Sequence, residues 1–130
     1  MPGPARAGLM LYAKDVARLE RFYGDIAVMR RLHADDHIAV LESADLQLVL
    51  HVIPPHIAAD ITITTPPQRR EDTALKFFFT VDGTLDALAP RIAAHGGVLF
   101  EERWNGPGFV AANAMDPEGN VLQVRETKSG

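Results

Sequence analysis

Residues 9–15, Leu-Met-Leu-Tyr-Ala-Lys-Asp, decide the fold of this chain. The apolar run stops at Lys14-Asp15, a pattern that predicts a half-buried strand meeting the N-cap of a helix. From Val16 to Ile26 apolar side chains recur every three or four residues, which predicts an amphipathic helix, and Gly24 is expected to end it early. Extended segments at about 28–34, 37–42 and 46–53, with turn residues between them, predict an antiparallel meander.

The same β-α-β-β-β order returns in the second half of the chain. A shift from residue 9 to residue 77 places Leu-Met-Leu on Phe-Phe-Phe, and both fourth strands carry Leu-Gln-aliphatic. The second copy is predicted as a strand at 76–81, a helix from about Thr84, and strands near 98–104, 109–115 and 120–126. Pro90 is expected to kink this helix or delay its start. Because each copy alone leaves a sheet face that only the other can cover, we expect a pseudo-twofold pair.

Composition limits the class of protein. A chain of 130 residues is about the size of one domain, so we treat residues 1–130 as a single domain with a linker at 54–74, in which 61–64 is a candidate edge strand. The net charge of -4 argues against nucleic acid as a partner. With no cysteine, disulfides, thiolate metal sites and thiol nucleophiles are excluded. Without a long apolar segment we expect no membrane association and a cytoplasmic location.

Three groups of residues carry a family resemblance. They are 9–15 with Phe22-Tyr23, Val81-Asp82-Gly83 with Leu85 and Leu88, and Asp116-Pro117-Glu118-Gly119-Asn120-Val121. From about Gly8 to Glu126 the chain resembles the vicinal oxygen chelate superfamily, which includes glyoxalase I, extradiol dioxygenases and bleomycin resistance proteins. The resemblance implies an α+β fold of two tandem βαβββ modules, at about 8–53 and 75–126, that form a half-closed mixed β-barrel cleft with the helices outside. It also implies a homodimer.

The metal positions implied by the resemblance carry unsuitable side chains. Enzymes of this superfamily place one ligand on the first and one on the fourth strand of each module, usually histidine and glutamate. Carried over by motif, these positions are Gly8, Gln47, Lys76 and Gln123. Glycine has no side-chain donor, glutamine is a weak neutral ligand, and a lysine ammonium repels a divalent cation. We therefore expect no metal and no other cofactor.

Strand alternation places polar and aromatic side chains on the faces away from the helices, where they are expected to line one cleft. The predicted ligand-binding residues are Tyr12, Gln47, His51, Lys76, Phe78, Gln123 and Arg125, with Trp104 and Phe109 on a neighbouring hairpin. Amides and cations can grip an anionic or carbonyl-rich edge, and aromatic rings can stack on a conjugated body. We predict a protein that sequesters or senses such a small molecule, as antibiotic-resistance members of the superfamily do. Structural roles remain open: Lys76 can extend into solvent, the glutamines can bond backbone, and Trp104 can pack in the core.

Two other classes of function stay open. The first is an enzyme: a metal-dependent lyase, isomerase or dioxygenase with displaced ligands, or a metal-free catalyst that uses Tyr12 or His51. His51 is the histidine predicted to face the cleft, and with Glu42 or Glu102 it could rebuild a metal site. The second class is an interaction domain within a larger complex. No residue is assigned a catalytic role from the sequence.

Overall fold

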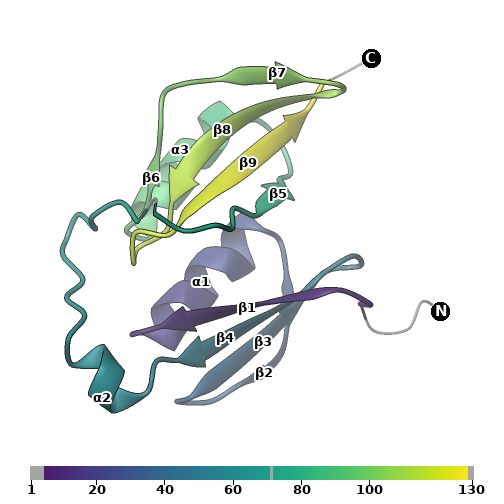
Figure 1. Ribbon diagram of the computed structural model, residues 1–130. Helices are drawn as coiled ribbons and strands as arrows, with labels where there is room; N and C mark the ends of the chain where they lie inside the picture. Colours follow the sequence, from purple (N-terminus) through teal and green to yellow (C-terminus); the bar gives the residue numbers. More distant parts are fainter. Residues whose placement is uncertain (1–4, 71, 129–130) are drawn as a thin grey trace. The chain divides into compact units, whose positions relative to one another are not determined.

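The computed structural model describes residues 5–70 and 72–128. These residues divide into two compact units at the boundary between Thr62 and Ile63. Each unit contains its own open sheet covered on one face by a helix (Figure 1). The predicted α+β class with two β-α-β-β-β repeats is therefore confirmed. Within the described part of the chain, none of the helices has the length and apolar character needed to span a bilayer.

The first unit confirms the predicted meander. Its elements are β1 (Gly8–Ala13), α1 (Val16–Ile26), β2 (Arg30–Ala34), β3 (Ile38–Glu42), β4 (Gln47–Val52) and a short α2 (Pro55–Ala58). The sheet order is β1-β4-β3-β2, with β1 parallel to β4 and the other neighbours antiparallel. The helix between β1 and the meander allows the parallel pairing, since a parallel neighbour needs a crossover connection.

Helix α1 begins where the sequence predicts and ends later. Asp15 is its N-cap, and the carboxylate accepts a hydrogen bond of 3.1 Å from the Arg18 amide. The apolar stripe, including Leu19, Phe22 and Ile26, is completely buried, and the helix packs on β3 and β4. The early end expected at Gly24 is wrong, because the apolar stripe continues to Ile26 and its burial offsets the cost of about 1 kcal/mol that glycine imposes.

The second unit repeats the first with a shorter first strand and with two longer strands at its end. Its elements are β5 (Phe78–Thr80), α3 (Leu85–Ala94), β6 (Val98–Leu99), β7 (Trp104–Gly106), β8 (Phe109–Met115) and β9 (Val121–Thr127). The sheet order is β5-β9-β8-β6, with β7 also paired to β8 and β5 parallel to β9. Thr84 is the N-cap of α3, and the helix continues through Pro90. The start predicted near Thr84 is therefore confirmed, and of the two effects expected of Pro90 the delayed start does not occur. Buried Leu85, Leu88 and Ile92 hold the helix on both sides of the proline.

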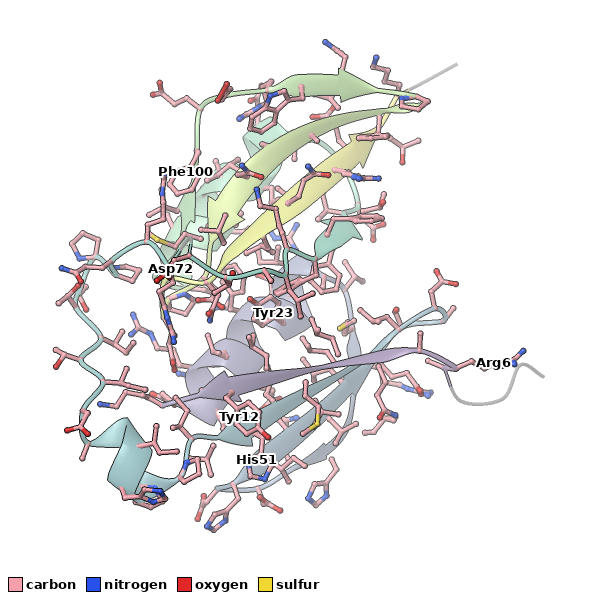
Figure 2. All side chains as sticks on the ribbon, in the orientation of Figure 1. Arg6, Tyr12, Tyr23, His51, Asp72 and Phe100 are labelled. Carbon is pink, nitrogen blue, oxygen red and sulfur yellow. The ribbon has the colours of Figure 1, made fainter. Side chains whose placement is uncertain are left out.

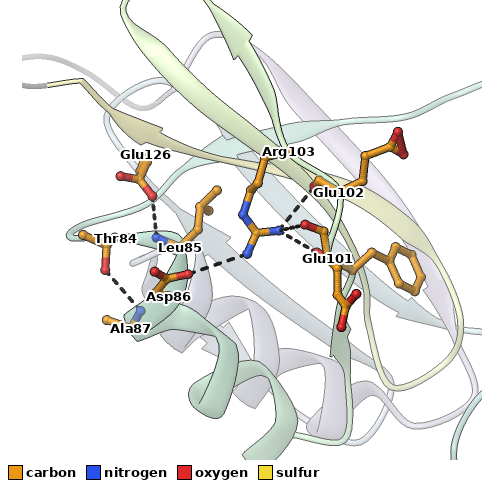
Figure 3. A network of polar contacts seen from close by, with 9 residues as sticks. Thr84, Leu85, Asp86, Ala87, Glu101, Glu102, Arg103 and Glu126 are labelled. Carbon is orange, nitrogen blue, oxygen red and sulfur yellow. Dashed lines mark hydrogen bonds and ion pairs between the residues drawn. The ribbon is translucent and has the colours of Figure 1, made fainter.

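The predicted strand at 98–104 is interrupted. Arg103 Nη1 donates to the carbonyl oxygens of Phe100, Glu101 and Glu102 at 2.7, 3.0 and 3.3 Å, and Nη2 lies 3.9 Å from Asp86 Oδ1 on α3 (Figure 3). These carbonyls are satisfied by a side chain instead of a neighbouring strand, so two short strands, β6 and β7, replace one.

The linker also differs from the prediction. Residues 61–64 form no strand, and α2 begins at Pro55, where the fixed φ of proline suits the first turn of a helix. The strand predicted at 76–81 is reduced to β5, so Lys76 lies before it.

The Asp116–Asn120 turn holds the end of the linker. Asp116 Oδ1 accepts the amide hydrogens of Glu118 and Asn120 at 2.9 and 3.0 Å, and Oδ2 accepts one from Asn120 Nδ2 at 2.9 Å. Gly119 has φ +91°, and a Cβ there would lie 1.9 Å from the Gln68 carbonyl oxygen. Arg70 forms a parallel bridge with Asn120. The buried turn thus fixes the backbone of residues 68–70 on the second sheet.

Candidate ligand site

The face of the second sheet away from α3 carries the polar residues predicted for a ligand site. On β9, Leu122 and Val124 are completely buried, and α3 packs against this strand. Gln123 and Arg125 alternate with them and are only half-buried. In the register Gln123 lies between Phe78 of β5 and Asn113 of β8. We call this surface the open face of the second sheet.

Arg125 is the most strongly positioned side chain on the open face. Its Nε donates to Gln123 Oε1 at 2.6 Å, and its guanidinium carbon lies 3.6 Å from the Phe78 ring centroid and 4.1 Å from that of Phe109. Contacts of this kind between a guanidinium and aromatic faces are favourable and fix the plane of the group. No acceptor among the described residues bonds its Nη atoms. The side chain is therefore oriented and keeps donors available for an anionic partner.

Lys76 and Asn113 extend the polar surface. Lys76 Nζ lies 3.5 Å from Asn113 Oδ1, at the outer limit of a hydrogen bond, and Lys76 is exposed. Asn113 was not among the residues predicted from the sequence. The signal for it was available, since it alternates with Phe109 and Ala111 along β8.

The register also refines the position of Lys76. Gly8 lies directly opposite Gln47 in the first sheet, whereas Gln123 lies opposite Phe78, two residues after Lys76. Lys76 is therefore displaced along the chain from the residue that pairs with Gln123.

Trp104 and Phe109 lie on the hairpin at the edge of the second sheet. Trp104 pairs with Ala111, and Gly106 pairs with Phe109. The Phe109 ring covers Gly106, because a Cβ at that glycine would come within 2.2 Å of the ring. Trp104 is 40% exposed and Phe78 is 51% exposed, so both can contact a ligand. The alternative of Trp104 as a core residue is not supported.

The first sheet brings Tyr12 and His51 together. They are neighbours in the β1–β4 register, and their ring centroids lie 5.6 Å apart at an interplanar angle of 56° (Figure 2). His51 Nδ1 lies 2.8 Å from the Val52 carbonyl oxygen, and Tyr12 is 51% exposed. Gln47 lies at the other end of β4. That these three residues share one cleft with the open face of the second sheet stays a prediction.

The donors present do not fit the divalent metal that the fold family implies. Glycine, two glutamines and a lysine stand at the expected positions, and within residues 5–70 and 72–128 no three histidine, aspartate or glutamate side chains cluster closely enough to hold an ion. Glu42 pairs with Gln47 and His51 pairs with Ile38. Four residues of strand separate the two positions, about 13 Å, so Glu42 and His51 cannot share a metal. Glu102 belongs to the second unit, between β6 and β7.

Solved structures share this fold at low sequence identity. A glyoxalase/bleomycin resistance protein/dioxygenase family enzyme from Burkholderia phytofirmans PsJN aligns with 95% of this chain and 99% of its own, with a TM-score of 0.70 and 17% identity. A fosfomycin resistance protein from Listeria monocytogenes gives 0.65 and 15%, covering 94% and 92% of the two chains. Lactoylglutathione lyase from Agrobacterium tumefaciens gives 0.58 and 23%, covering 97% and 96%.

These similarities establish the fold and confirm the architecture that the resemblance implies. No family model matches the chain, and no curated protein matches it in sequence. The fold does not by itself assign a reaction.

Proposed function

We propose that this protein, whose fold is that of the glyoxalase/bleomycin resistance/dioxygenase proteins, binds a small organic ligand without a metal and sequesters or senses it. The observation that supports the proposal is Arg125, which is oriented by Gln123, Phe78 and Phe109 on the open face of the second sheet. An arginine fixed in this way is suited to bidentate recognition of a carboxylate or a similar anionic edge.

The other residues of the open face indicate which groups the ligand carries besides its anionic edge. Exposed Phe78 and Trp104 offer apolar surface for an aromatic or conjugated body. The amides of Asn113 and Gln123 can bond carbonyl or hydroxyl groups, and Lys76 adds a second positive charge. We infer a planar ligand with one anionic edge.

Calorimetric titration with three matched probes tests the proposal. The probes are 2-naphthoate, the neutral 2-naphthamide, and decalin-2-carboxylate, which keeps the charge and loses the aromatic ring. We expect 2-naphthoate to bind most tightly, with each other probe weaker by about tenfold, because each lacks one charge-assisted or aromatic contact. No binding of 2-naphthoate, or binding of the saturated probe alone, would overturn the proposal.

A metal-free catalyst is the second candidate, and the pairing of Tyr12 with His51 favours it. An exposed phenol beside an imidazole can serve as a proton donor and acceptor pair. A metal-dependent lyase, isomerase or dioxygenase would need donors other than those the described residues bring together. Elemental analysis of protein purified without chelators separates the metal-dependent alternative from both others.

We also propose that the protein is a cytoplasmic homodimer, as the family resemblance implies. Light scattering coupled to size-exclusion chromatography gives the mass of the particle in solution. A mass equal to one chain of 14.2 kDa would contradict the dimer.

A further inference from the structure

A cavity of about 300 Å³ lies within the second unit, between the segment that precedes β5 and the start of β9. Its polar lining comes from Arg70, Thr73 and Lys76, and its apolar lining from Ala74, Leu75 and Val121. Arg70 lies in the segment predicted as a linker, and Lys76 is the one predicted ligand-binding residue among the described residues of this lining.

Among the described residues the lining is cationic. Arg70 and Lys76 each carry a positive charge, and none of the described lining residues is an aspartate or glutamate. Arg70 Nη1 is buried and has no hydrogen-bond partner among the described residues. Lys76 contacts only the neutral Asn113 Oδ1, at 3.5 Å. A buried guanidinium nitrogen without an acceptor is unfavourable.

The backbone beside the cavity is fixed by the Asp116–Asn120 turn. The Arg70 amide donates to the Gly119 carbonyl at 2.8 Å, in addition to the bridge with Asn120. The Arg70 side chain packs beside Gly119, since a Cβ at that glycine would lie 3.4 Å from Arg70 Cγ. The arginine is therefore held by an ordered turn, and ligand binding does not have to order it first.

We propose that this cavity binds an oxyanion of the phosphate class. Two cations, with no acid among the described lining residues, match a phosphate group, which carries about -1.5 to -2 charges at neutral pH, better than a singly charged carboxylate. The volume corresponds to about ten water molecules, which exceeds the anion alone. The apolar lining suits a small organic substituent, so the class is a phosphate monoester.

The proposed phosphate site is separate from the ligand site on the open face, although Lys76 belongs to both. Arg70 is therefore the diagnostic residue. Arg69 provides the matched control, because it is the neighbouring arginine, does not line the cavity, and has its guanidinium carbon 3.9 Å from the Phe100 ring centroid.

The experiment is a calorimetric titration of the whole chain with inorganic phosphate, phenyl phosphate and acetate at constant ionic strength. We expect one saturable phosphate site, tighter binding of phenyl phosphate, and no saturation with acetate. Arg70→Gln should weaken phosphate by about tenfold or more, because one charge-assisted contact is lost, and Arg69→Gln should leave the affinity unchanged. Arg70→Gln should also leave 2-naphthoate binding unchanged, so that failure of one site is distinguishable from failure of the other.

Three results would overturn the inference: no saturable phosphate binding, equal losses in Arg69→Gln and Arg70→Gln, or acetate binding as tight as phosphate. Thermal melting without phosphate checks that the variants fold. If Arg70→Gln is unfolded, Arg70→Lys takes its place, since it keeps the charge and loses the planar fork. Its phosphate affinity should then fall by a smaller factor, and an unchanged affinity would count against the site.

Discussion

The guanidinium carbon of Arg125 lies 3.6 Å from the ring centroid of Phe78, on the face of the second sheet that α3 leaves uncovered. Gln123, two residues earlier on β9, accepts a hydrogen bond from Arg125 Nε and so fixes the guanidinium from its other side. This contact links β5, at the edge of the sheet, to its neighbour β9 through side chains. The two strands are also paired through their backbones.

Replacing Arg125 by methionine should separate binding from stability. Methionine keeps an apolar stem against Phe78 and removes the charge, so 2-naphthoate affinity should fall by about tenfold or more while the thermal midpoint changes little. Calorimetry and a melting curve measure the two quantities. Lys128→Gln removes one positive charge from an exposed position after the same strand and should leave the affinity unchanged. Equal losses in both variants would mean that only net charge matters.

Chelator treatment should not affect ligand binding. The four positions implied by the fold family lack carboxylate and imidazole donors, so dialysis against EDTA should leave the affinity for 2-naphthoate as it was. Elemental analysis should find iron, nickel, zinc and manganese below stoichiometric amounts. Loss of binding with EDTA that one of these metals restores would contradict the metal-free proposal.

The role of the first sheet can be tested at His51. If the ligand also contacts the pair formed by Tyr12 and His51, His51→Ala should weaken 2-naphthoate by about threefold or more, as expected for the loss of one neutral hydrogen bond or ring contact. His56→Ala changes an exposed histidine on α2 and serves as the control. An unchanged affinity in His51→Ala would restrict the ligand site to the second sheet.

Two glycine substitutions should have opposite effects on stability. Gly119→Ala places a Cβ against the Gln68 carbonyl at φ +91°, and we expect a loss of about 1–3 kcal/mol in the free energy of unfolding. Gly24→Ala lies within α1 with open space around the new methyl group, and we expect a gain of up to about 1 kcal/mol. Urea denaturation measures both, and a neutral Gly119→Ala would show that the turn can rearrange.

Asp35 should make stability depend on acid pH. Amide hydrogen bonds from His37 first, then the side chain of His33, and the Ile38 amide lower the pKa of Asp35 from 3.8 to about 2. A depressed folded-state pKa stabilises the folded protein above pH 3.8, and this contribution is lost as the pH falls toward 2. The stability difference between wild type and Asp35→Asn should therefore shrink between about pH 4 and pH 2. A constant difference across this window would contradict the assignment.

Local sequence signals predicted most of the fold because they depend on neighbouring residues. Asp15 caps its helix as expected, and α3 begins next to Thr84 as predicted. Leu48 and Leu50 alternate into the core, with Gln47 and Val49 on the other face. Each of these patterns can be recognised from residues within one or two helical turns or within one strand.

The features that were missed depend on contacts between distant residues. Arg103 interrupts the strand at 98–104 by bonding three carbonyls, and its approach to Asp86 of α3 is not visible in the local pattern. The cavity beside Arg70 likewise exists because residues 68–70 pack on the Asp116–Asn120 turn, about fifty residues later in the chain. The contact of Arg125 with Phe78 and Phe109 needed the register of three strands.

The division of the chain at residue 62 also separates its chromophores. Tyr12 and Tyr23 both belong to the first unit, and the single tryptophan, Trp104, belongs to the second. The emission of the indole, excited where tyrosine does not absorb, therefore reports on the second half of one unmodified polypeptide, whereas far-ultraviolet circular dichroism reports on the backbone of both halves. Superimposable melting curves from the two signals would indicate that both halves unfold as one cooperative entity.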